Sequence, residues 1–445
     1  MLRKNEMLES FFAPLLNPDI DKLEQLRQSI ILKKGVRYFD WTASGLASML
    51  VEKRVKKLLP YYANTHSEAS SHASLMWAVY ERSKESLKKS LGLGEDFAII
   101  CAGFGATGAI KRFQEILGIY IPSKTKHFLF NKIKGLTLPK VLIGPYEHHS
   151  NEISWREGLC NVQRVPLDTE GLLDLKIFQK YLQCDQNIYA SFSAASNVTG
   201  IISPHKEISA LCKKYGAVLG FDMASFSAYG NIDANLFDAC FLSAHKLLGG
   251  VGTNGLLGIR KYLVDTDIPP SFGGGGVIKY ANRKTQEYFE DVQIREEAGT
   301  PGLLQTYKSA LAYMLRDEYS LEAIRRREHI LTQAFLYELA SIPAVRIYGN
   351  LDADRLGIVS FNVGGVSPYD LAYLLSNVYS IETRAGCSCA GPYGHDLLEM
   401  KDMSSQDLEE KPGWLRVSLH YTHSLEDIEY LTDSLKKAVK KLRGA

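Results

Sequence analysis

The feature that most constrains the fold is the alternation of short apolar segments with amphipathic segments through the first three hundred residues. The apolar segments are rich in Val, Ile and Phe, and the segments between them repeat apolar residues at helical spacing. This alternation favours a doubly wound, mostly parallel α/β sheet of about seven strands, covered by helices on both faces. The candidate strands are residues 97–103, 140–146, 161–167, 187–193, 217–223 and 238–244, and the candidate helices are residues 107–118, 172–182 and 205–216.

The pattern changes after residue 300, where one long helical segment over residues 307–342 leads into a second group of elements. This group would form a smaller C-terminal α+β domain. Its strands are predicted over residues 344–349, 357–363 and 414–420, and its closing helix over residues 425–442. We therefore expect a helical N-terminal segment (1–35) that packs on the small domain, a large domain (36–315) and the small domain itself (316–445).

Charge and hydropathy bear on partners and location. Lys and Arg number 52 against 50 Asp and Glu, and they are spread along the chain, which argues against a nucleic-acid or membrane surface and favours a small-molecule partner. No apolar run reaches the roughly 18 residues that span a bilayer. The first twenty residues also lack a signal-peptide core. We expect a soluble, cytoplasmic protein.

The seven cysteines do not form a recognisable framework. Their odd number and scattered positions in a long chain argue against a disulfide scaffold. A structural zinc site would need four ligands, and no second Cys or His pair stands at zinc-site spacing, so no metal is expected. The cysteines are residues 101, 160, 184, 212, 240, 387 and 389.

Polar residues follow two of the predicted strands. Asp222 ends one strand in "FDMAS", and Ser243, His245 and Lys246 follow the next in "SAHK". Parallel strands place their carboxyl ends along one crevice, where ligands bind. A lysine for a Schiff base, an acid for a pyridine nitrogen and donors for a phosphate are what a pyridoxal phosphate enzyme needs. Taken singly, such a lysine is more often a solvated loop residue and such an aspartate more often a cap.

Three further strand ends carry suitable residues. "GFGATG" places Gly105, Ala106 and Thr107 at a strand-to-helix turn, where backbone N–H groups and the helix dipole hold anions. "EHHSN" offers His148 as an aromatic plate, and "SNVTG" offers Asn197. The Gly-rich stretch at 270–280 has no helix start after it, which favours a loop over a phosphate cradle.

Together these segments resemble the class V aminotransferase group of fold-type I pyridoxal phosphate enzymes, and especially the cysteine desulfurases and selenocysteine lyases. The resemblance covers about residues 37 to 440, with the motifs in the family's order. The matching stretches are "YFDWTASG", "YANTHSEAS", "GFGATGAI", "EHHSN", "SNVTGIISP", "FDMAS", "SAHKLLGG", "EEAGTP", "RAGCSCAGP" and "LRVSLHYTHSLEDI".

The resemblance implies a role for each matching residue. Lys246 would bind the cofactor pyridoxal 5'-phosphate covalently, Asp222 would pair with its ring nitrogen, and His148 would stack on the ring and shuttle protons. Thr300 would contact the cofactor bound to the other subunit, in a homodimer with shared active sites. The remaining cofactor contacts would come from Ala106, Thr107, Asn197, Ser225, Ser243 and His245.

The resemblance also assigns the substrate groups. Arg416, assisted by Arg384 and Asn197, would grip the α-carboxylate of an amino acid, because a guanidinium offers two parallel hydrogen bonds. The desulfurase pattern R-x-G-x-x-C-A-x-P is filled by "RAGCSCAGP", which makes Cys389 the candidate nucleophile. Its thiolate would attack the sulfur, or selenium, of bound L-cysteine or selenocysteine. The products would be alanine and a Cys389 persulfide, which a protein acceptor would discharge.

Three positions depart from the family pattern. Cys387 stands where many desulfurases have histidine, and we interpret it as a bystander rather than a second sulfur acceptor. In an extended segment it would lie about 6.6 Å from Cys389, so a disulfide would need distortion. Ser225 replaces the usual Gln, so the effect of this position on the electronic properties of the cofactor ring stays open. His395 would line the entrance or be an ordinary solvated loop residue.

Two other readings stay open. One is a class V aminotransferase or another C–S lyase that does not use Cys389. The other is a protein that binds the cofactor without turnover and acts as a sulfur carrier or scaffold.

Overall fold

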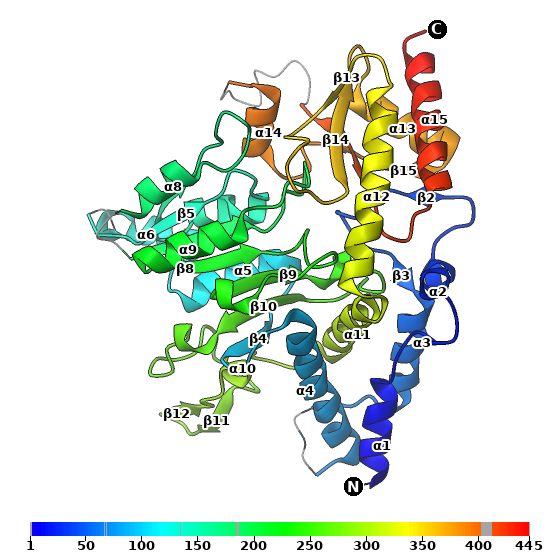
Figure 1. Ribbon diagram of the computed structural model, residues 1–445. Helices are drawn as coiled ribbons and strands as arrows, with labels where there is room; N and C mark the ends of the chain where they lie inside the picture. The colour runs from blue at the N-terminus through cyan, green and yellow to red at the C-terminus, as the bar shows by residue number, and fades with distance from the viewer. Residues whose placement is uncertain are drawn as a thin grey trace.

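The large sheet has seven strands in the order β4-β10-β9-β8-β7-β5-β6. In the computed structural model, which describes residues 2–65, 67, 69–133, 135–183, 187–401 and 412–444, this sheet forms the centre of the larger body (Figure 1). Only β10 runs antiparallel to its neighbours. The strands are β4 (Phe97–Cys101), β5 (Lys140–Ile143), β6 (Asn161–Arg164), β7 (Ile188–Ser193), β8 (Val218–Asp222), β9 (Ala239–Ser243) and β10 (Gly255–Arg260).

The sequence prediction of a mostly parallel seven-stranded α/β fold is confirmed, and each of the six strands predicted in this region is present. β10 was not predicted. Its segment begins after the Gly-rich stretch Gly249–Gly252, and its antiparallel pairing with β4 and β9 needs no helix before it.

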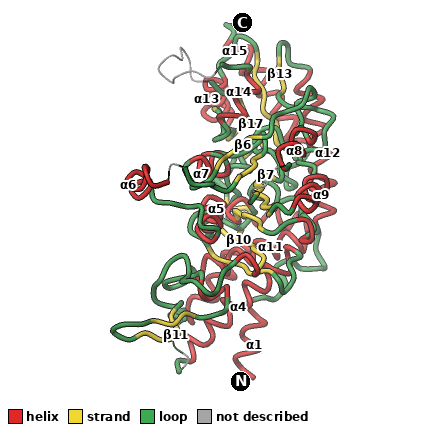
Figure 2. Tube along the Cα trace, turned by 90° about the vertical axis from the view of Figure 1, so that its left-hand side faces the viewer, coloured by secondary structure: helices red, strands yellow, loops and turns green. Residues whose placement is uncertain are grey.

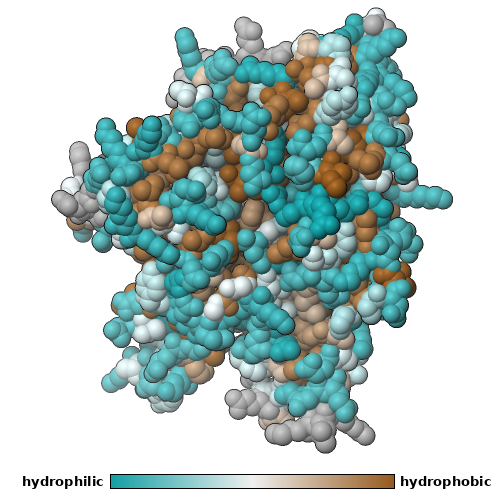
Figure 3. Space-filling model, in the orientation of Figure 1, coloured by the Kyte–Doolittle hydropathy of each residue, from teal (hydrophilic) through white to brown (hydrophobic). Residues whose placement is uncertain are grey.

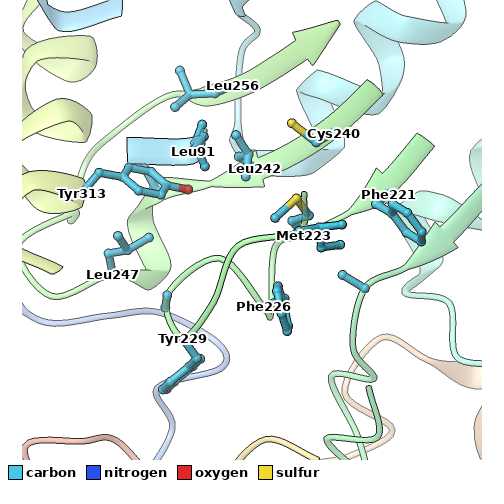
Figure 4. Packing of buried hydrophobic residues seen from close by; sticks show 14 of the residues in the cluster. Leu91, Phe221, Met223, Phe226, Tyr229, Cys240, Leu242, Leu247, Leu256 and Tyr313 are labelled. Carbon is cyan, nitrogen blue, oxygen red and sulfur yellow. The ribbon is translucent and has the colours of Figure 1, made fainter. Parts of the chain in front are cut away.

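Alternate residues of the strands pack on opposite faces of the sheet. Ile99 and Leu242 belong to one buried cluster, whereas their neighbours Ile100 and Phe241 belong to another. Figure 4 shows the first cluster, in which Leu242 lies beside residues of other elements. Burial on both faces explains why the strands are almost continuously apolar. The helices that pack around the sheet are α4 (Ser71–Leu91), α5 (Gly105–Ile116), α8 (Leu175–Leu182), α9 (His205–Tyr215) and α11 (Leu303–Tyr319).

A second, antiparallel sheet has the strand order β13-β14-β17-β16 and its own buried cluster. The carboxylate of Asp427 and the hydroxyl of Ser424 form a capping box that begins the last helix. The strands and helices here are β13 (Val345–Ile347), β14 (Ile358–Val363), β16 (Arg384–Gly386), β17 (Trp414–Ser418), α12 (Leu321–Ala340), α13 (Pro368–Tyr379) and α15 (Leu425–Leu442). β15 (Ile381–Glu382) pairs in parallel with β2 (Arg37–Tyr38).

The single helix predicted over residues 307–342 is wrong. The structure has two helices, α11 and α12, which meet at Ser320 (Figure 1). Ser320 has a φ of 86°, outside the helical region, and its hydroxyl accepts the N–H of Ala323 as the N-cap of α12. A serine that caps the following turn competes with helix continuation, and apolar periodicity does not reveal it.

The N-terminal segment touches both parts of the molecule. The phenol of Tyr307 in α11 donates to the carbonyl of Phe11, and the guanidinium of Arg27 donates to the carbonyls of Thr422 and His423. The domain limits at residues 35 and 315, and the packing of this segment on the small domain, stay predictions. The two helices of the segment are α1 (Leu2–Phe11) and α2 (Lys22–Ser29).

Several short elements lie between these layers or stand out from them. Figure 2 shows α6 (Ser123–Ile133) and the β11 hairpin projecting on the same side of the molecule. The others are β1 (Ile30–Ile31), β3 (Ala47–Ser48), α3 (Met49–Leu58), η1 (Leu59–Tyr61), η2 (His149–Asn151), α7 (Ile153–Arg156), η3 (Ala234–Leu236), η4 (Ala244–Lys246), η5 (Lys261–Leu263), β11 (Ile278–Ala281), β12 (Gln286–Tyr288), α10 (Val292–Arg295) and α14 (Gly391–Leu398).

The surface mixes hydrophilic and hydrophobic side chains, with hydrophilic ones widespread on the face shown in Figure 3. Within the described ranges of the chain, no helix has both the length and the hydropathy needed to cross a membrane.

Candidate active site

A cavity of about 490 Å³ lies where the carboxyl ends of the central strands meet the turn after β16. The predicted cofactor, catalytic and substrate residues line it except Thr300, and His395, considered for the entrance, does not line it either. Those that line it are Ala106, Thr107, His148, Asn197, Asp222, Ser225, Ser243, His245, Lys246, Arg384, Cys389 and Arg416.

Lys246 and Asp222 reach this cavity from neighbouring strands. Asp222 is the last residue of β8, and Lys246 ends the short helix η4 that follows β9. Burial raises the pKa of the Asp222 carboxyl, and the N–H of Ala224 donates to it at 2.9 Å. Burial lowers the pKa of Lys246 to about 8, and the negative charge of Asp222 opposes that shift. At neutral pH about a tenth of this amine is therefore unprotonated and nucleophilic, far more than for an ordinary lysine.

The first turn of α5 forms a pocket for an anion. Gly105 has a φ of 55°, and a Cβ there would lie 2.9 Å from the hydroxyl of Ser243, so a side chain would fill the space. The N–H of Ala106 donates to that hydroxyl at 2.8 Å. The hydroxyl of Thr107 lies 2.7 Å from that of Ser150. Backbone N–H groups and hydroxyls at a helix N-terminus are a donor set that suits a phosphate.

His148 is a neutral imidazole with a defined tautomer. Its Nδ1 accepts the N–H of Ser150 at 3.1 Å, which places the ring hydrogen on Nε2. Burial lowers the pKa of His148 to about 3, and the positive charge of Lys246 adds to the shift. The pKa of His245 is lowered to about 4 by burial and then by the same lysine. Both rings are therefore neutral at physiological pH.

Two arginines share one carboxylate at the far side of the cavity. Asp40 accepts from Arg416 at 2.8 Å and from Arg384 at 3.1 Å. Arg416 is buried, and it also donates to the carbonyl of Asn197 at 2.9 Å. Its Nε is buried without a hydrogen-bond partner in the described part of the chain. Because Arg416 also lines the cavity, its guanidinium is suited to donate hydrogen bonds to a further carboxylate.

Asp40 was not predicted as a site residue. Its stretch "YFDWTASG" matched the family pattern, so the position could have been found from that motif. The lining residues that sequence reasoning missed are Thr42, Ala43, Ser44, Phe104, Ser150, Ser193, Ala195, Ala224, Gly252, Thr253 and Ser388. Ser193 ends β7, so its place at a strand end was a usable signal, whereas nothing in the sequence points to Phe104.

Cys389 lies in a tight turn rather than an extended segment. Ser388 and Cys389 have φ values of 53° and 57°, and the N–H of Ala390 donates to the carbonyl of Cys387 at 3.0 Å. Two consecutive positive φ values closed by that hydrogen bond have the pattern of a type I′ turn. The extended spacing assumed for Cys387 and Cys389 is therefore wrong, and both thiols are free.

The turn exposes only one of its cysteines to the cavity. Cys389 is exposed and lines it, whereas Cys387 is half-buried against the large apolar cluster. The side-chain amide of Asn197 donates to the carbonyl of Ser388 at 2.7 Å. Asn197 thus links the turn to Arg416, whose guanidinium holds its backbone carbonyl.

Two predicted residues lie elsewhere. Thr300 is exposed, does not line the cavity, and accepts a hydrogen bond from Asn64 at 3.3 Å. His395 lies half-buried in α14, and it is not among the residues that line the cavity. Within the described ranges, no group of three or more His, Cys, Asp or Glu side chains is arranged to hold a metal ion.

Comparison with known proteins places this geometry in a family. The family model described as "Aminotransferase class-V" matches residues 37–431. The chain belongs to the aminotransferase class-V family. This class-V chain is 29% identical over 433 residues to a probable cysteine desulfurase of Pyrococcus abyssi, covering 95% of this chain and 99% of that protein. It is 29% identical over 310 residues to a cysteine desulfurase of Serratia proteamaculans, covering 68% and 72%.

Solved structures of cysteine desulfurases share the fold. The apo structure of a cysteine desulfurase from Thermococcus onnurineus has a TM-score of 0.80 at 27% identity, covering 94% of this chain and 98% of that chain. A cysteine desulfurase from Escherichia coli has a TM-score of 0.76 at 20% identity, covering 95% and 99%, a likeness that shows the fold alone.

Proposed function

We propose that this class-V enzyme is a pyridoxal phosphate-dependent cysteine desulfurase, which takes sulfur from L-cysteine and leaves alanine and a persulfide on Cys389. The observation that carries the proposal is the meeting of Lys246, Asp222, the arginine pair and Cys389 in one cavity. The likeness to proteins named cysteine desulfurase over most of the chain supports it.

The cavity fits the cofactor by its donor set. The first turn of α5 with Ser243 would hold the phosphate, where the missing side chain of Gly105 leaves room. Asp222 would hold the ring nitrogen, and Lys246 would bind the aldehyde. When bound, pyridoxal phosphate supplies an electron sink for charge that develops at the substrate Cα.

The substrate would be oriented by its carboxylate. Arg416 and Arg384 both line the cavity, and they donate to different oxygens of Asp40. Two guanidinium groups held by one aspartate present fixed donors, so the carboxylate binds in one orientation. That orientation places the substrate side chain toward Cys389 only if the turn after β16 keeps its conformation.

Two groups of the chain would move protons. The amine of Lys246, with a pKa lowered by burial to about 8, is a suitable base for the Cα hydrogen once it is free. His148 is neutral with its hydrogen on Nε2, so it would offer a hydrogen-bond donor in the same cavity. Neither role needs a further side chain.

Sulfur transfer would use the thiolate of Cys389. The thiolate attacks the substrate sulfur, so a sulfur–sulfur bond forms and the carbon–sulfur bond breaks. The electron pair of the broken bond stays on the carbon fragment, which takes up protons and leaves as alanine. The persulfide sulfur then passes to a thiol acceptor, which we propose is a second protein.

We also propose that the enzyme is a cytoplasmic homodimer in which Thr300 reaches the cofactor phosphate of the other subunit. Its exposure and its distance from the cavity of its own chain fit this assignment. Light scattering of the purified protein measures the assembly. At a cofactor concentration that saturates the wild type but not Thr300→Val, mixing Lys246→Ala and Thr300→Val subunits should regenerate one intact site in the mixed dimer and raise activity above that of either parent, and a mixture without that rise would refute the sharing.

One observation favours a second candidate, a class-V lyase or aminotransferase that does not use Cys389. Ser225 lines the cavity near Asp222, where the family usually has the longer Gln. A serine reaches less far toward the ring, which changes the electronics that decide the reaction. A sulfur carrier without turnover is less supported, because Lys246 and Asp222 line the same cavity.

The deciding experiment incubates the holoenzyme with L-cysteine and measures alanine, pyruvate and sulfide. A desulfurase gives alanine and sulfur in equal amounts, the latter as sulfide when a thiol reductant is present. Pyruvate with sulfide would indicate a lyase instead, and amino transfer to an added 2-oxo acid would indicate an aminotransferase.

A further inference from the structure

His149 and His148 are adjacent in sequence, but they serve different parts of the site. Their ring centroids lie 6.3 Å apart with an angle of 50° between the planes. His148 lines the cavity, whereas His149 does not. His149 is instead in contact with the segment that carries Cys389.

His149 holds this segment at two points. Its backbone N–H donates to the carbonyl of Cys389 at 2.7 Å. Its ring Nε2 accepts the N–H of Gly391 at 2.8 Å. A Cβ on Gly391 would lie 2.9 Å from that nitrogen, so only glycine allows the approach. The N–H of Gly391 is one of the free donors at the start of α14, and the imidazole satisfies it.

The segment needs such support because its backbone is strained. Positive φ values at Ser388 and Cys389 cost each residue on the order of 1 kcal/mol relative to an ordinary conformation. The amide of Asn197 and the indole of Trp414 hold Ser388, at its carbonyl and hydroxyl respectively. On the Cys389 side, the hydrogen bonds among the described residues come from His149 and from the N–H of Gly394, which donates to the carbonyl of Ala390 within α14.

The environment of His149 keeps its ring able to accept. Burial lowers the pKa of His149, and the positive charge of Arg156 adds to the shift. A neutral ring with its hydrogen on Nδ1 presents the Nε2 lone pair to Gly391. A protonated ring would present a donor to a donor.

We propose that His149 is a positioning residue for Cys389: by bracketing residues 389 and 391 it fixes the strained turn that presents the thiol to the substrate sulfur. This inference rests on the proposed desulfurase function. It assigns no contact of His149 with substrate or cofactor, so His149 should affect the sulfur step and leave the earlier binding steps unchanged.

The test compares His149→Leu with His149→Gln in the holoenzyme. Gln places an acceptor oxygen about as far from Cβ as Nε2, whereas Leu has the bulk without the acceptor. For L-cysteine, we expect His149→Leu to lower kcat about tenfold, the equivalent of one lost hydrogen bond, with KM changed less than about twofold. His149→Gln should recover most of kcat. The cofactor absorbance, and its change on mixing with L-cysteine, should be retained in both variants.

Hydrogen exchange gives a readout that does not depend on turnover. The peptide over residues 387–394 should exchange faster in His149→Leu and near the wild-type rate in His149→Gln, while the peptide over residues 218–226 stays unchanged in both. Equal exchange in all three proteins would overturn the proposal, as would a kcat of His149→Gln as low as that of His149→Leu. Absence of alanine from the wild-type enzyme would count against the proposed function alone, because the exchange comparison still tests the bracket.

Discussion

The two halves of the site are built in different ways. Lys246 and Asp222 stand at the ends of neighbouring parallel strands in the large sheet, where both flanking strands are buried. Cys389 stands in a turn with two positive φ values, and hydrogen bonds from Asn197, His149 and Trp414 hold the segment around it.

The cofactor-binding residues and the thiol are therefore held in place by different kinds of structure. Strand ends are fixed by a sheet that is packed on both faces, so the cofactor residues need little local support. The turn places the thiol only while distant side chains hold it against its own conformational preference. Mutations far from the chemistry should therefore affect the second half more than the first.

The largest effect on activity should come from removing the amine of Lys246, in the cofactor-binding half of the site. In Lys246→Ala the cofactor loses its covalent attachment and the reaction loses its base, so activity should fall by about ten thousandfold or more. The visible absorbance of the bound cofactor should change at the same time. The fold should be unchanged, which circular dichroism checks. An active Lys246→Ala enzyme would show that the reaction does not need this amine.

Removing the thiol should break the second half alone. Cys389→Ser should lower alanine formation from L-cysteine by about a hundredfold or more, because an oriented nucleophile is lost. Cofactor absorbance should stay as in the wild type. The matched control is Cys387→Ser, which does not line the cavity and should keep most of the activity. A reversal of the two results would make Cys387 the nucleophile.

The carboxylate that joins the two arginines should matter for stability as well as for binding. Asp40→Ala leaves Arg416 buried without its ion partner, which should lower the free energy of unfolding by about 3 to 5 kcal/mol. Denaturant titration of the apoenzyme measures this change. Glu322→Ala, which removes an exposed partner of Arg326, should cost less than about 1 kcal/mol. Equal costs in the two variants would contradict the buried bridge.

The pH dependence of cofactor attachment tests whether the amine of Lys246 is desolvated. Burial lowers the pKa of Lys246 to about 8, so the amine that attacks the aldehyde should be half unprotonated near that pH and about nine-tenths unprotonated one pH unit higher. The rate of apoenzyme reconstitution should therefore rise with pH, with its midpoint near pH 8, and then level off. Because Asp222 raises this pKa, Asp222→Asn should move the midpoint lower. A rate that keeps rising toward the ordinary lysine pKa would show that the amine is not desolvated.

The smallest effect should come from the anion pocket. Thr107→Val keeps the side-chain shape but removes a hydroxyl at the first turn of α5. The loss of one hydrogen bond to a charged group corresponds to about a tenfold weaker affinity for pyridoxal phosphate, with kcat nearly unchanged. Equilibrium titration of the apoenzyme measures it. Unchanged affinity would place the phosphate elsewhere.

The sequence predicted the cofactor-binding half of the site, with Asp222 and Lys246, better than the turn that carries Cys389. The strands and the residues at their ends follow from hydrophobic patterning, so β8 with Asp222 and β9 with Lys246 were within reach. Cys389 was found only through its motif, and the assumption of an extended segment around it was wrong. The bracket by His149 depends on residues more than two hundred positions apart, and local patterning carries no such information.

The break at Ser320 shows the same limit in the fold. The apolar period runs through both α11 and α12, while one capping hydroxyl decides where the first helix ends. Asp40 shows the same limit in the site. Its role follows from its ion pairs with Arg384 of β16 and Arg416 of β17, which lie far from it in the sequence.

Lys246 and Cys389 line one cavity, so the amine and the thiol should act on the same substrate. The most direct measurement mixes the holoenzyme with L-cysteine without reductant, digests it at once, and maps the added sulfur by mass spectrometry. The account predicts one extra sulfur atom on the Cys389 peptide in the wild type and none in Lys246→Ala. Sulfur on another cysteine, or alanine release with Cys389 unmodified, would contradict it.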